Sequence, residues 1–358
     1  MKRRLLIIAA VVAIVTLALT ALLTSEAGLQ WAFARAAALA SGELRVQALQ
    51  GNLLGPIRAR GIVYRDARTE LHIGELVLDW QPGALLRATW HITRLELDDV
   101  QLQRRSTPAS NAPAPRLSLP LAVELDAVRL THATFTIDET DPVTQVRAEL
   151  SGSGHDTRVR LTQFTLETEH YSVAAAGQID LAPPYPVDLD LRWSVRVPSL
   201  APLTGHGWLR GDTRRLATEQ QLAPPWSAQL NASASDVLGA TSWNATLATA
   251  DLDPATWRHG WPAAMLRARI EAQGDRRQLT ARGRVGITRA GRTLDGDVRI
   301  RAADTGVTLE ALTLRERDGD AMLSATGAWQ PGDAAAPFAL RGTWQALRWP
   351  LTGEPQAR

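Results

Sequence analysis

The chain has 358 residues, of which 45% are apolar and 21% are charged, and this balance excludes an intrinsically disordered protein. It contains no cysteine, which excludes disulfide bonds and thiolate metal sites. The formal net charge is +2, with 39 basic residues interleaved among 37 acidic ones, and this favours solvated surfaces over nucleic-acid binding.

An uncharged apolar segment, residues 5–23, is the first element of the chain. As a helix it would rise about 28 Å, close to the roughly 30 Å hydrocarbon core of a bilayer. A cleavable signal peptide would have a shorter apolar region followed by a small-x-small cleavage site. We therefore predict an uncleaved transmembrane anchor over residues 5–25.

Three cations precede this anchor and predict its orientation. Lys2, Arg3 and Arg4 place a tip of residues 1–4 on the cytoplasmic side under the positive-inside rule. The bulk of the chain is then expected in the periplasm, as in a single-pass protein of the bacterial inner membrane. After the anchor, the Ala-rich residues 26–41 predict a juxtamembrane helix, with Trp31 near the membrane interface.

From residue 42 onward, apolar and polar residues alternate with a period of two, as in VDLDLRWSV (187–195). This pattern is typical of antiparallel strands with one apolar and one solvated face. A proline-rich stretch predicts a surface loop over residues 106–120. An Asp-Pro start predicts short helices at about 254–266, one around residues 255–259 and a second near 263–266.

The alternation slips by one residue in LELDDVQL (95–102), where Leu95 and Leu97 precede Asp98-Asp99 and Val100 and Leu102 follow. The same slip recurs at 57–64, 71–78, 123–130, 159–166 and 307–314. An extra residue inside a strand forms a β-bulge, which bends the sheet and restores the apolar face beyond it. The alternative is a tight turn between two short strands, for which pairs such as Thr162-Gln163 are poor. We predict bulges.

A longer internal repeat aligns residues 159–195 with 307–344, so that Gly177 falls on Gly327 and Trp193 falls on Trp344. Each copy has the pattern of three strands: a slipped strand, a glycine-containing strand and a strand that ends near tryptophan. This repetition indicates a sheet built from similar units.

The apolar face of about twenty such strands needs a partner, and the chain has too few helices to cover it. A closed sheet, a sandwich with an ordinary core and a curled sheet with an open lining are the alternatives. Because the anchor makes lipid the obvious partner, we predict an all-β fold, an elongated antiparallel sheet curled into a groove over 42–358. The candidate lipid-facing residues are Leu76, Leu78, Trp80, Leu95, Leu97, Val100, Leu102, Val123, Leu125, Val128, Leu130, Leu161, Phe164, Leu166, Leu189, Leu191, Trp193, Leu309, Leu312 and Leu314.

The sequence has no catalytic motif. Seven histidines are scattered without the spacing of metal ligands. SGSGHD (151–156) holds Ser, His and Asp side by side, but adjacent residues cannot converge as a triad. A phosphate-binding loop is also missing from the sequence. We expect no enzymatic activity, no metal and no cofactor.

Several longer stretches carry a resemblance to a known family. SEAGLQ follows the anchor and is succeeded by LRVQALQGNLLGPIRARGIVYRD and by LHIGELVLDWQPGALLRATWHITRLELDDVQL. Further on lie WRHGWPAAMLRARIEAQG and ATGAWQP. In this order the chain resembles the TamB proteins (translocation and assembly module subunit) of the AsmA-like group.

The resemblance implies a β-taco, or repeating β-groove, fold between the inner and outer membranes. It implies transport of phospholipid toward the outer membrane, with an outer-membrane TamA-like barrel as partner. The alternative that it implies is a scaffold for the assembly or secretion of autotransporters and other outer-membrane proteins. Family members are several times longer, and so we expect this chain to represent the amino-terminal portion, truncated at its carboxyl end.

Overall fold

The computed structural model describes residues 20–105, 116–138, 142–197, 200–256, 263–304, 306–330 and 338–346. The expected cytoplasmic tip and residues 5–19 of the expected anchor lie outside these ranges, as do Lys2, Arg3 and Arg4. Residues 20–24 are helical, and a bend at Ser25 separates them from the next helix. Within the described ranges, no helix is both long and apolar enough to cross a bilayer.

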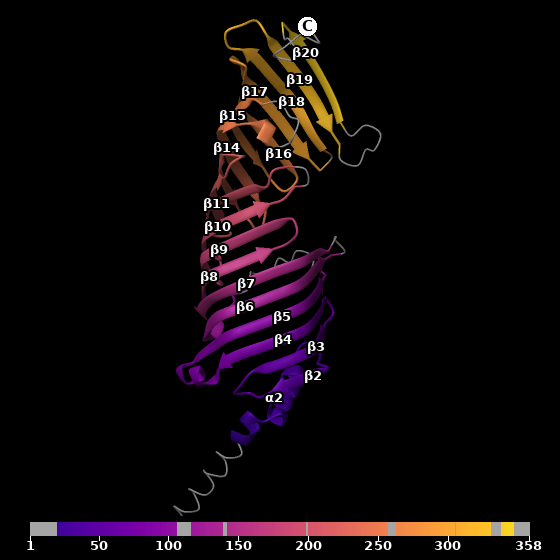
Figure 1. Cartoon of the computed structure of the whole chain (residues 1–358), viewed down its shortest axis with the longest axis vertical. Helices are drawn as coiled ribbons and strands as arrows, with labels where there is room; N and C mark the ends of the chain where they lie inside the picture. Colours follow the sequence, from indigo (N-terminus) through magenta and orange to yellow (C-terminus); the bar gives the residue numbers. More distant parts are fainter. Residues whose placement is uncertain are drawn as a thin grey trace, which may run out of the picture. The chain divides into compact units, whose positions relative to one another are not determined.

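The described residues form 20 strands, and the fold is all-β (Figure 1). The chain divides into two compact units, residues 1–183 and 184–358, which are described separately below. In neither unit does a pairing between described strands join the first strand to the last, and so each unit is an open sheet.

Beyond the helical residues 20–24, the first unit contains one α-helix, one 3-10 helix and nine strands among its described residues. The elements are α2 (Glu26–Leu39), β1 (Glu43–Arg45), β2 (Ala48–Gly51), β3 (Ile57–Arg65), β4 (Thr69–Gln81), η1 (Pro82–Arg87), β5 (Thr89–Arg104), β6 (Leu119–Ile137), β7 (Val143–Asp156), β8 (Arg158–Glu167) and β9 (Tyr171–Asp180). β1 and β2 share one edge of β3, and β3 to β9 then follow in chain order.

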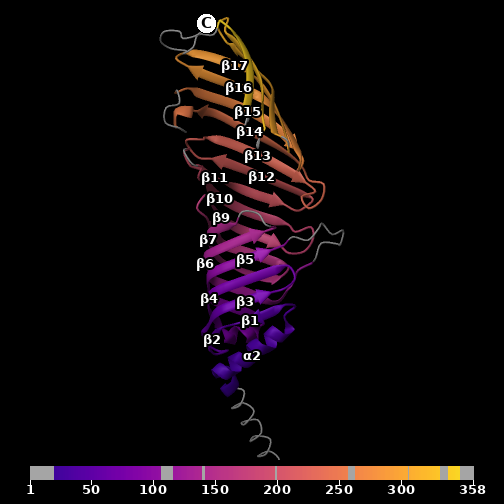
Figure 2. The same cartoon turned by 90° about the vertical axis from the view of Figure 1, so that its right-hand side faces the viewer.

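The second unit contains eleven strands and one 3-10 turn among its described residues. The elements are β10 (Val187–Val195), β11 (Leu203–Gly211), β12 (Arg215–Leu222), β13 (Ala228–Ser235), β14 (Ser242–Leu252), η2 (Pro254–Thr256), β15 (Met265–Gly274), β16 (Gln278–Arg289), β17 (Arg292–Ala303), β18 (Gly306–Glu316), β19 (Met322–Trp329) and β20 (Phe338–Gln345). Consecutive strands pair antiparallel throughout, and Figure 2 shows β14 to β17 side by side.

α2 lies within the segment where we expected a juxtamembrane helix. The Ser25 hydroxyl caps its first turn by accepting a hydrogen bond from the backbone N–H of Gly28 at 3.1 Å. Trp31 is 54% exposed, and the Arg35 guanidinium lies 5.8 Å from its ring centroid. α2 packs against β1 and β2, and so it covers only the first edge of the unit.

One pair of neighbouring strands differs from the antiparallel expectation. β5 and β6 are parallel, with Thr89 opposite Ala122 and Arg104 opposite Ile137. A parallel pair needs a long connection, which the proline-rich stretch supplies. Residues 106–115 of that stretch lie outside the described ranges, and the expected loop ends early because β6 begins at Leu119.

The segment at about 254–266, where we expected short helices, is described only in part. Only η2, Pro254–Thr256, is helical among the described residues, and 257–262 lie outside them. The second expected helix, near 263–266, is wrong because β15 begins at Met265 and Leu266 pairs with Ile287 of β16. Long-range pairing of an alternating strand outweighs a local capping signal here.

The predicted bulges are confirmed in β8 and β18. In β8, Leu161 and Phe164 lie opposite Gly177 and Ala175 of β9, so three steps on β8 match two on β9. β18 repeats this geometry, with Leu309 and Leu312 opposite Gly327 and Ala325 of β19. The internal repeat therefore reproduces a bulge at the same place in two hairpins.

The slips in β3, β4 and β5 behave differently because they face one another. The register between β3 and β4 is unbroken on both sides of Gly61 and Gly74, and Gly61 has φ +61°. The slip at Asp98-Asp99 likewise keeps a constant register with β4, and Asp99 adopts φ +51°. Both partners carry the extra residue at the same height, so the strands bend together without a register shift. β5 is one continuous strand, which excludes the tight-turn alternative for LELDDVQL.

Candidate functional site

The candidate residues of the first unit lie in rows across neighbouring strands. Leu76 of β4 is opposite Leu97 of β5, and Leu97 is opposite Leu130 of β6. Residues that are directly opposite in a sheet point to the same face. A second row passes through Leu78, Leu95 and Val128, and so the slipped segments present one shared apolar face.

The same rows continue into β8. Leu130 and Val128 of β6 face Ala148 and Leu150 of β7, which in turn face Leu166 and Phe164 of β8. A third row runs from Leu125 through Gly152 to Leu161. The structure therefore brings the expected β4, β5, β6 and β8 residues together on one surface, which we name the unit-1 apolar face. It comprises Leu76, Leu78, Trp80, Leu95, Leu97, Val100, Leu102, Val123, Leu125, Val128, Leu130, Leu161, Phe164 and Leu166.

The second unit has an equivalent surface, which we name the unit-2 apolar face. Its central row passes through Leu230, Leu247, Ile270, Gly283, Val298, Leu312 and Ala325 on seven consecutive strands. The expected Leu309 and Leu314 lie in the flanking rows, opposite Ile300 and Gly296. Sequence reasoning did not single out Ile270 or Val298 as lining residues, although period-two alternation around each could have found them.

The exposed fraction of each side chain distinguishes the accessible residues of these faces from the buried ones. Val100 and Leu314 are buried at 5% and 3% exposed, whereas the other candidate residues are half-buried. A half-buried apolar side chain still presents part of its surface to whatever lies over the sheet. In the described part of the chain, the α-helical residues are 20–24 and α2, and α2 packs at the edge. Both faces are thus available to an apolar ligand.

Sequence reasoning named Val100 as a lining residue but missed the three residues that are buried with it. Ile73, Val100, Ala133 and Val146 form a buried cluster, in which Ala133 is 0% and Val146 is 2% exposed. Leu97 and Leu130 pack against this cluster from the side. Burying such side chains contributes roughly 1.5–3 kcal/mol each for the larger ones. The cluster stabilises the sheet, and the neighbouring residues form the accessible surface.

A polar interruption lies on the unit-2 apolar face near Trp193. Gln220 is 6% exposed and accepts a hydrogen bond from the Trp193 indole N–H at 2.8 Å. Its amide donates to the Thr218 hydroxyl at 2.8 Å and to the Trp208 carbonyl at 3.2 Å. Trp193 lies across Gly205, where a Cβ would meet the indole at 2.5 Å. Trp193, which we expected as a lining residue, therefore contributes an apolar surface and also a hydrogen bond to Gln220.

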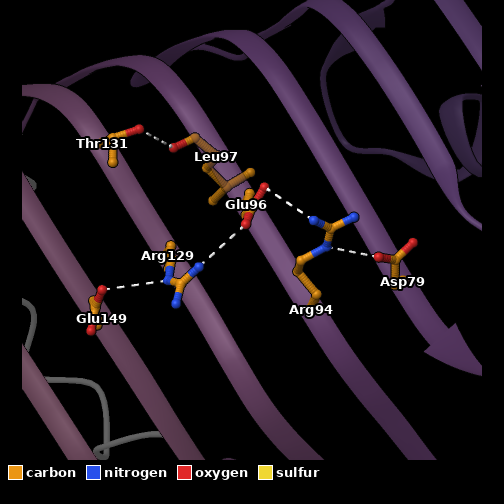
Figure 3. Close-up of polar contacts among 7 residues, drawn as sticks. All are labelled: Asp79, Arg94, Glu96, Leu97, Arg129, Thr131 and Glu149. Atoms are coloured by element: carbon orange, nitrogen blue, oxygen red, sulfur yellow. Dashed lines mark hydrogen bonds and ion pairs between the residues drawn. The ribbon is translucent and has the colours of Figure 1, made fainter.

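The opposite face of unit 1 is polar and carries a chain of ion pairs (Figure 3). Arg94 bonds Asp79 at 2.7 Å and lies 3.9 Å from Glu96, while Arg129 links Glu96 at 3.6 Å to Glu149 at 3.4 Å. These five residues span β4 to β7. Exposed ion pairs contribute only about 0.2–1 kcal/mol each to the stability of the fold. This series of ion pairs therefore mainly favours the correct alignment of neighbouring strands.

A second polar cluster lies at the slip shared by β5 and β6. The Thr131 hydroxyl donates to the Asp98 carboxylate at 2.6 Å, and His132 Nδ1 lies 2.7 Å from the same oxygen. The hydrogen bond from Thr131, followed by that from His132, lowers the pKa of the Asp98 carboxyl. His132 has φ +50°, as expected for the extra residue of a slipped strand.

Trp80 ends the β4 row and has a buried indole N–H without a hydrogen-bond partner among the described residues. Its strand shifts register between Asp79 and Trp80 relative to β5. Elsewhere in the described ranges, no three His, Asp or Glu side chains are grouped as metal ligands would be. The described residues therefore offer an apolar binding surface on one face of the sheet and polar, ion-paired residues on the other.

Together, these features define an all-β protein whose open sheets each carry a continuous, accessible apolar face. A family model described as TamB, N-terminal domain, matches residues 14–144 and again residues 110–238. The chain belongs to the TamB family, and the matched part corresponds to its N-terminal domain. Searches of curated proteins and of solved structures gave no significant match.

Proposed function

We propose that this chain is an inner-membrane-anchored periplasmic protein that carries phospholipid along its apolar faces toward the outer membrane. Membership of the TamB family links the chain to lipid or protein transport in general. The more specific choice of phospholipid is our own. It follows from the rows of half-buried apolar residues that cross β4 to β8 and β13 to β19.

Acyl-chain binding has a sufficient driving force on such a surface. Transfer of a hydrocarbon chain from water contributes about 0.8 kcal/mol per methylene, or up to about 11 kcal/mol for ~14 methylenes. Because successive rows present similar side chains, one bound position differs little in free energy from the next. A lipid tail can then move between rows without leaving the apolar surface.

The surrounding roles are part of the same proposal. The apolar residues 5–23 would hold the chain in the inner membrane, with the amino terminus in the cytoplasm. An outer-membrane TamA-like barrel would receive the lipid as partner of the complete translocation and assembly module. We propose that the chain acts by binding and carrying lipid, without enzymatic chemistry.

Site-specific photo-crosslinking in cells tests this function. A photo-reactive amino acid is placed at Leu97 on the unit-1 apolar face and at Leu312 on the unit-2 apolar face. Matched controls at Gln103 and Thr308 lie on the same strands and are exposed on the opposite face. We expect phospholipid adducts, identified by mass spectrometry, at both leucines and several-fold fewer at the controls.

The other outcomes of this experiment are equally informative. Adducts to protein alone at Leu97 and Leu312 would favour the assembly-scaffold function and contradict lipid transport. Equal lipid labelling at the leucines and the controls would show that the apolar faces do not select lipid. An absence of adducts outside the chain would mean that both faces are closed core.

A further inference from the structure

The turn between β4 and β5 presents leucine to solvent to an unusual degree. η1 spans Pro82–Arg87 and lies at the left end of β4 in Figure 1. Leu86 is 93% exposed and Leu85 is 43% exposed. Scattered exposed leucines are common, but a nearly free leucine beside a second one at the tip of a turn indicates a contact surface.

Local hydrogen bonds show that the exposure is built into a defined turn. Ala84 is buried at 3% and anchors the turn to the sheet. Ala88 adopts the left-handed conformation with φ 53°, and its N–H donates to the Leu85 carbonyl at 2.9 Å. The Ala88 carbonyl accepts from Ala122 of β6 at 3.1 Å. Leu85 and Leu86 are thus held away from the sheet by the turn itself.

The exposed turn is continuous with the unit-1 apolar face. Trp90 follows directly in β5, is 43% exposed and pairs with Val123 of β6. Leu121, two residues before Val123, is 38% exposed. These four side chains, Leu85, Leu86, Trp90 and Leu121, form what we name the η1 rim. An apolar molecule at the rim can reach the lining without crossing a polar band.

Charge at the η1 rim favours a phospholipid surface. Arg87 is the one charged residue in WQPGALLRATW (80–90), and the segment has no acidic residue. Leucine tips with an amphipathic tryptophan and a flanking arginine match the boundary between lipid headgroups and acyl chains. The Arg87 guanidinium can pair with the lipid phosphates, and the Trp90 indole has the mixed polar and apolar character of the membrane interface.

The path of the chain places the rim on the same side of unit 1 as the start of α2. Only residues 40–42 connect α2 to β1, so α2 runs back along β1 and β2, against which it packs. Its first turn is therefore directed toward Gly51, which pairs with Ile57, and Ile57 pairs with Leu78 near η1. In the sequence, Thr24 and Ser25 separate α2 from the uncharged residues 5–23.

We propose that the η1 rim inserts Leu85 and Leu86 into the interface of a phospholipid bilayer, with Arg87 among the headgroups. The rim is then the place where lipid passes from the bilayer onto the unit-1 apolar face. This last step rests on the proposed function, whereas insertion of the turn does not.

The absence of cysteine permits a direct test. The full chain with the single substitution Leu86→Cys is labelled with an environment-sensitive fluorophore and reconstituted in vesicles of zwitterionic and anionic phospholipid. The matched control is Val143→Cys, which is 39% exposed and pairs with Phe135 near the far end of β6, about 43 Å of strand from Ala122 beside η1. We expect a blue shift at Leu86 and several-fold stronger quenching by lipids that carry a spin label in the acyl chain.

Each result separates the two proposals. Quenching at Leu86 without lipid adducts at Leu97 would keep the membrane contact and overturn lipid transport. Adducts at Leu97 with an unquenched, solvent-like label at Leu86 would overturn the membrane contact and keep transport. Equal quenching at Leu86 and Val143 would also overturn the contact, because the rim would not be selected. A circular dichroism spectrum like that of the unmodified chain is required of both labelled variants.

Discussion

Asp98 shows how a single residue of a slipped strand is stabilised. It follows Leu97 of the apolar face, and its carboxylate accepts hydrogen bonds from Thr131 and His132 on the parallel strand β6. These bonds favour the ionised form and lower the pKa of Asp98 below its ordinary value. Asp98 therefore joins the parallel strands β5 and β6 on their polar side.

Thr131→Val should weaken this tie in a pH-dependent way. A carboxyl whose pKa is lower in the folded state stabilises the fold above its unfolded pKa, about 3.9, and loses that contribution as pH falls through the folded pKa. The variant should therefore unfold at lower urea concentration than the parent at pH 7, and the difference should shrink toward pH 3. Thr134→Val, on the same strand, serves as the control. A difference that stays constant with pH would show that Asp98 is not involved.

At the scale of the element, the bulge in β18 determines how two hairpins share one face. Glu310 is the extra residue, because Ala311 pairs with Arg299 while Leu309 pairs with Ile300. Its carboxylate reaches Arg301 at 2.8 Å on the polar side. Removing this one residue would leave Val307, Leu309, Leu312 and Leu314 in strict alternation.

Deletion of Glu310 should accordingly be tolerated. The pairs with β17 and β19 are preserved, and the loss is limited to an exposed ion pair, about 0.2–1 kcal/mol. Deletion of Thr313 is the matched contrast, because it turns the buried Leu314 to the opposite face at a cost of at least about 1.5–3 kcal/mol. Thermal unfolding of the two variants measures the loss of stability caused by each deletion. A larger loss for the Glu310 deletion would mean that the bend itself stabilises the sheet.

At the scale of the whole molecule, the two compact units each have their own buried cluster. Ile73, Val100, Ala133 and Val146 form that of the first unit, whereas Leu294, Leu314 and Ala321 form that of the second. In repetitive folds, stability is close to a sum over local interfaces, so damage need not spread through the chain. The units are therefore expected to lose structure separately.

Val146→Asp tests this independence by placing a carboxylate at a position that is 2% exposed. Burial of an unpaired charge costs several kcal/mol, and the first unit should open. Hydrogen exchange measured by mass spectrometry should show lost protection in β4 to β8 and retained protection in β15 to β19. The control Arg147→Gln, at the next and exposed position, should leave both units protected. Simultaneous loss in both units would instead reveal one cooperative sheet.

The sequence by itself determined which residues share a face. Period-two alternation is a local consequence of strand geometry, and so Leu95, Leu97 and their repeat equivalents could be assigned to one surface without coordinates. A bulge also has a local signature, and so the slips of β8 and β18 are predictable from the sequence without knowledge of a partner strand. The Ser25-capped helix α2 was likewise readable from its own composition.

Only the tertiary structure decided which strands pair and which residues of these faces are buried. The parallel β5–β6 pair, the matched slips of β4 and β5, and the burial of Val146 depend on residues far apart in the chain. The same is true of Gln220, a polar residue that joins the unit-2 apolar face because Trp193 bonds to it, and of Leu86, whose exposure depends on how its turn is anchored. Strand register and solvent exposure are set by non-local hydrogen bonds and packing, whereas alternation reports only the side to which a residue points.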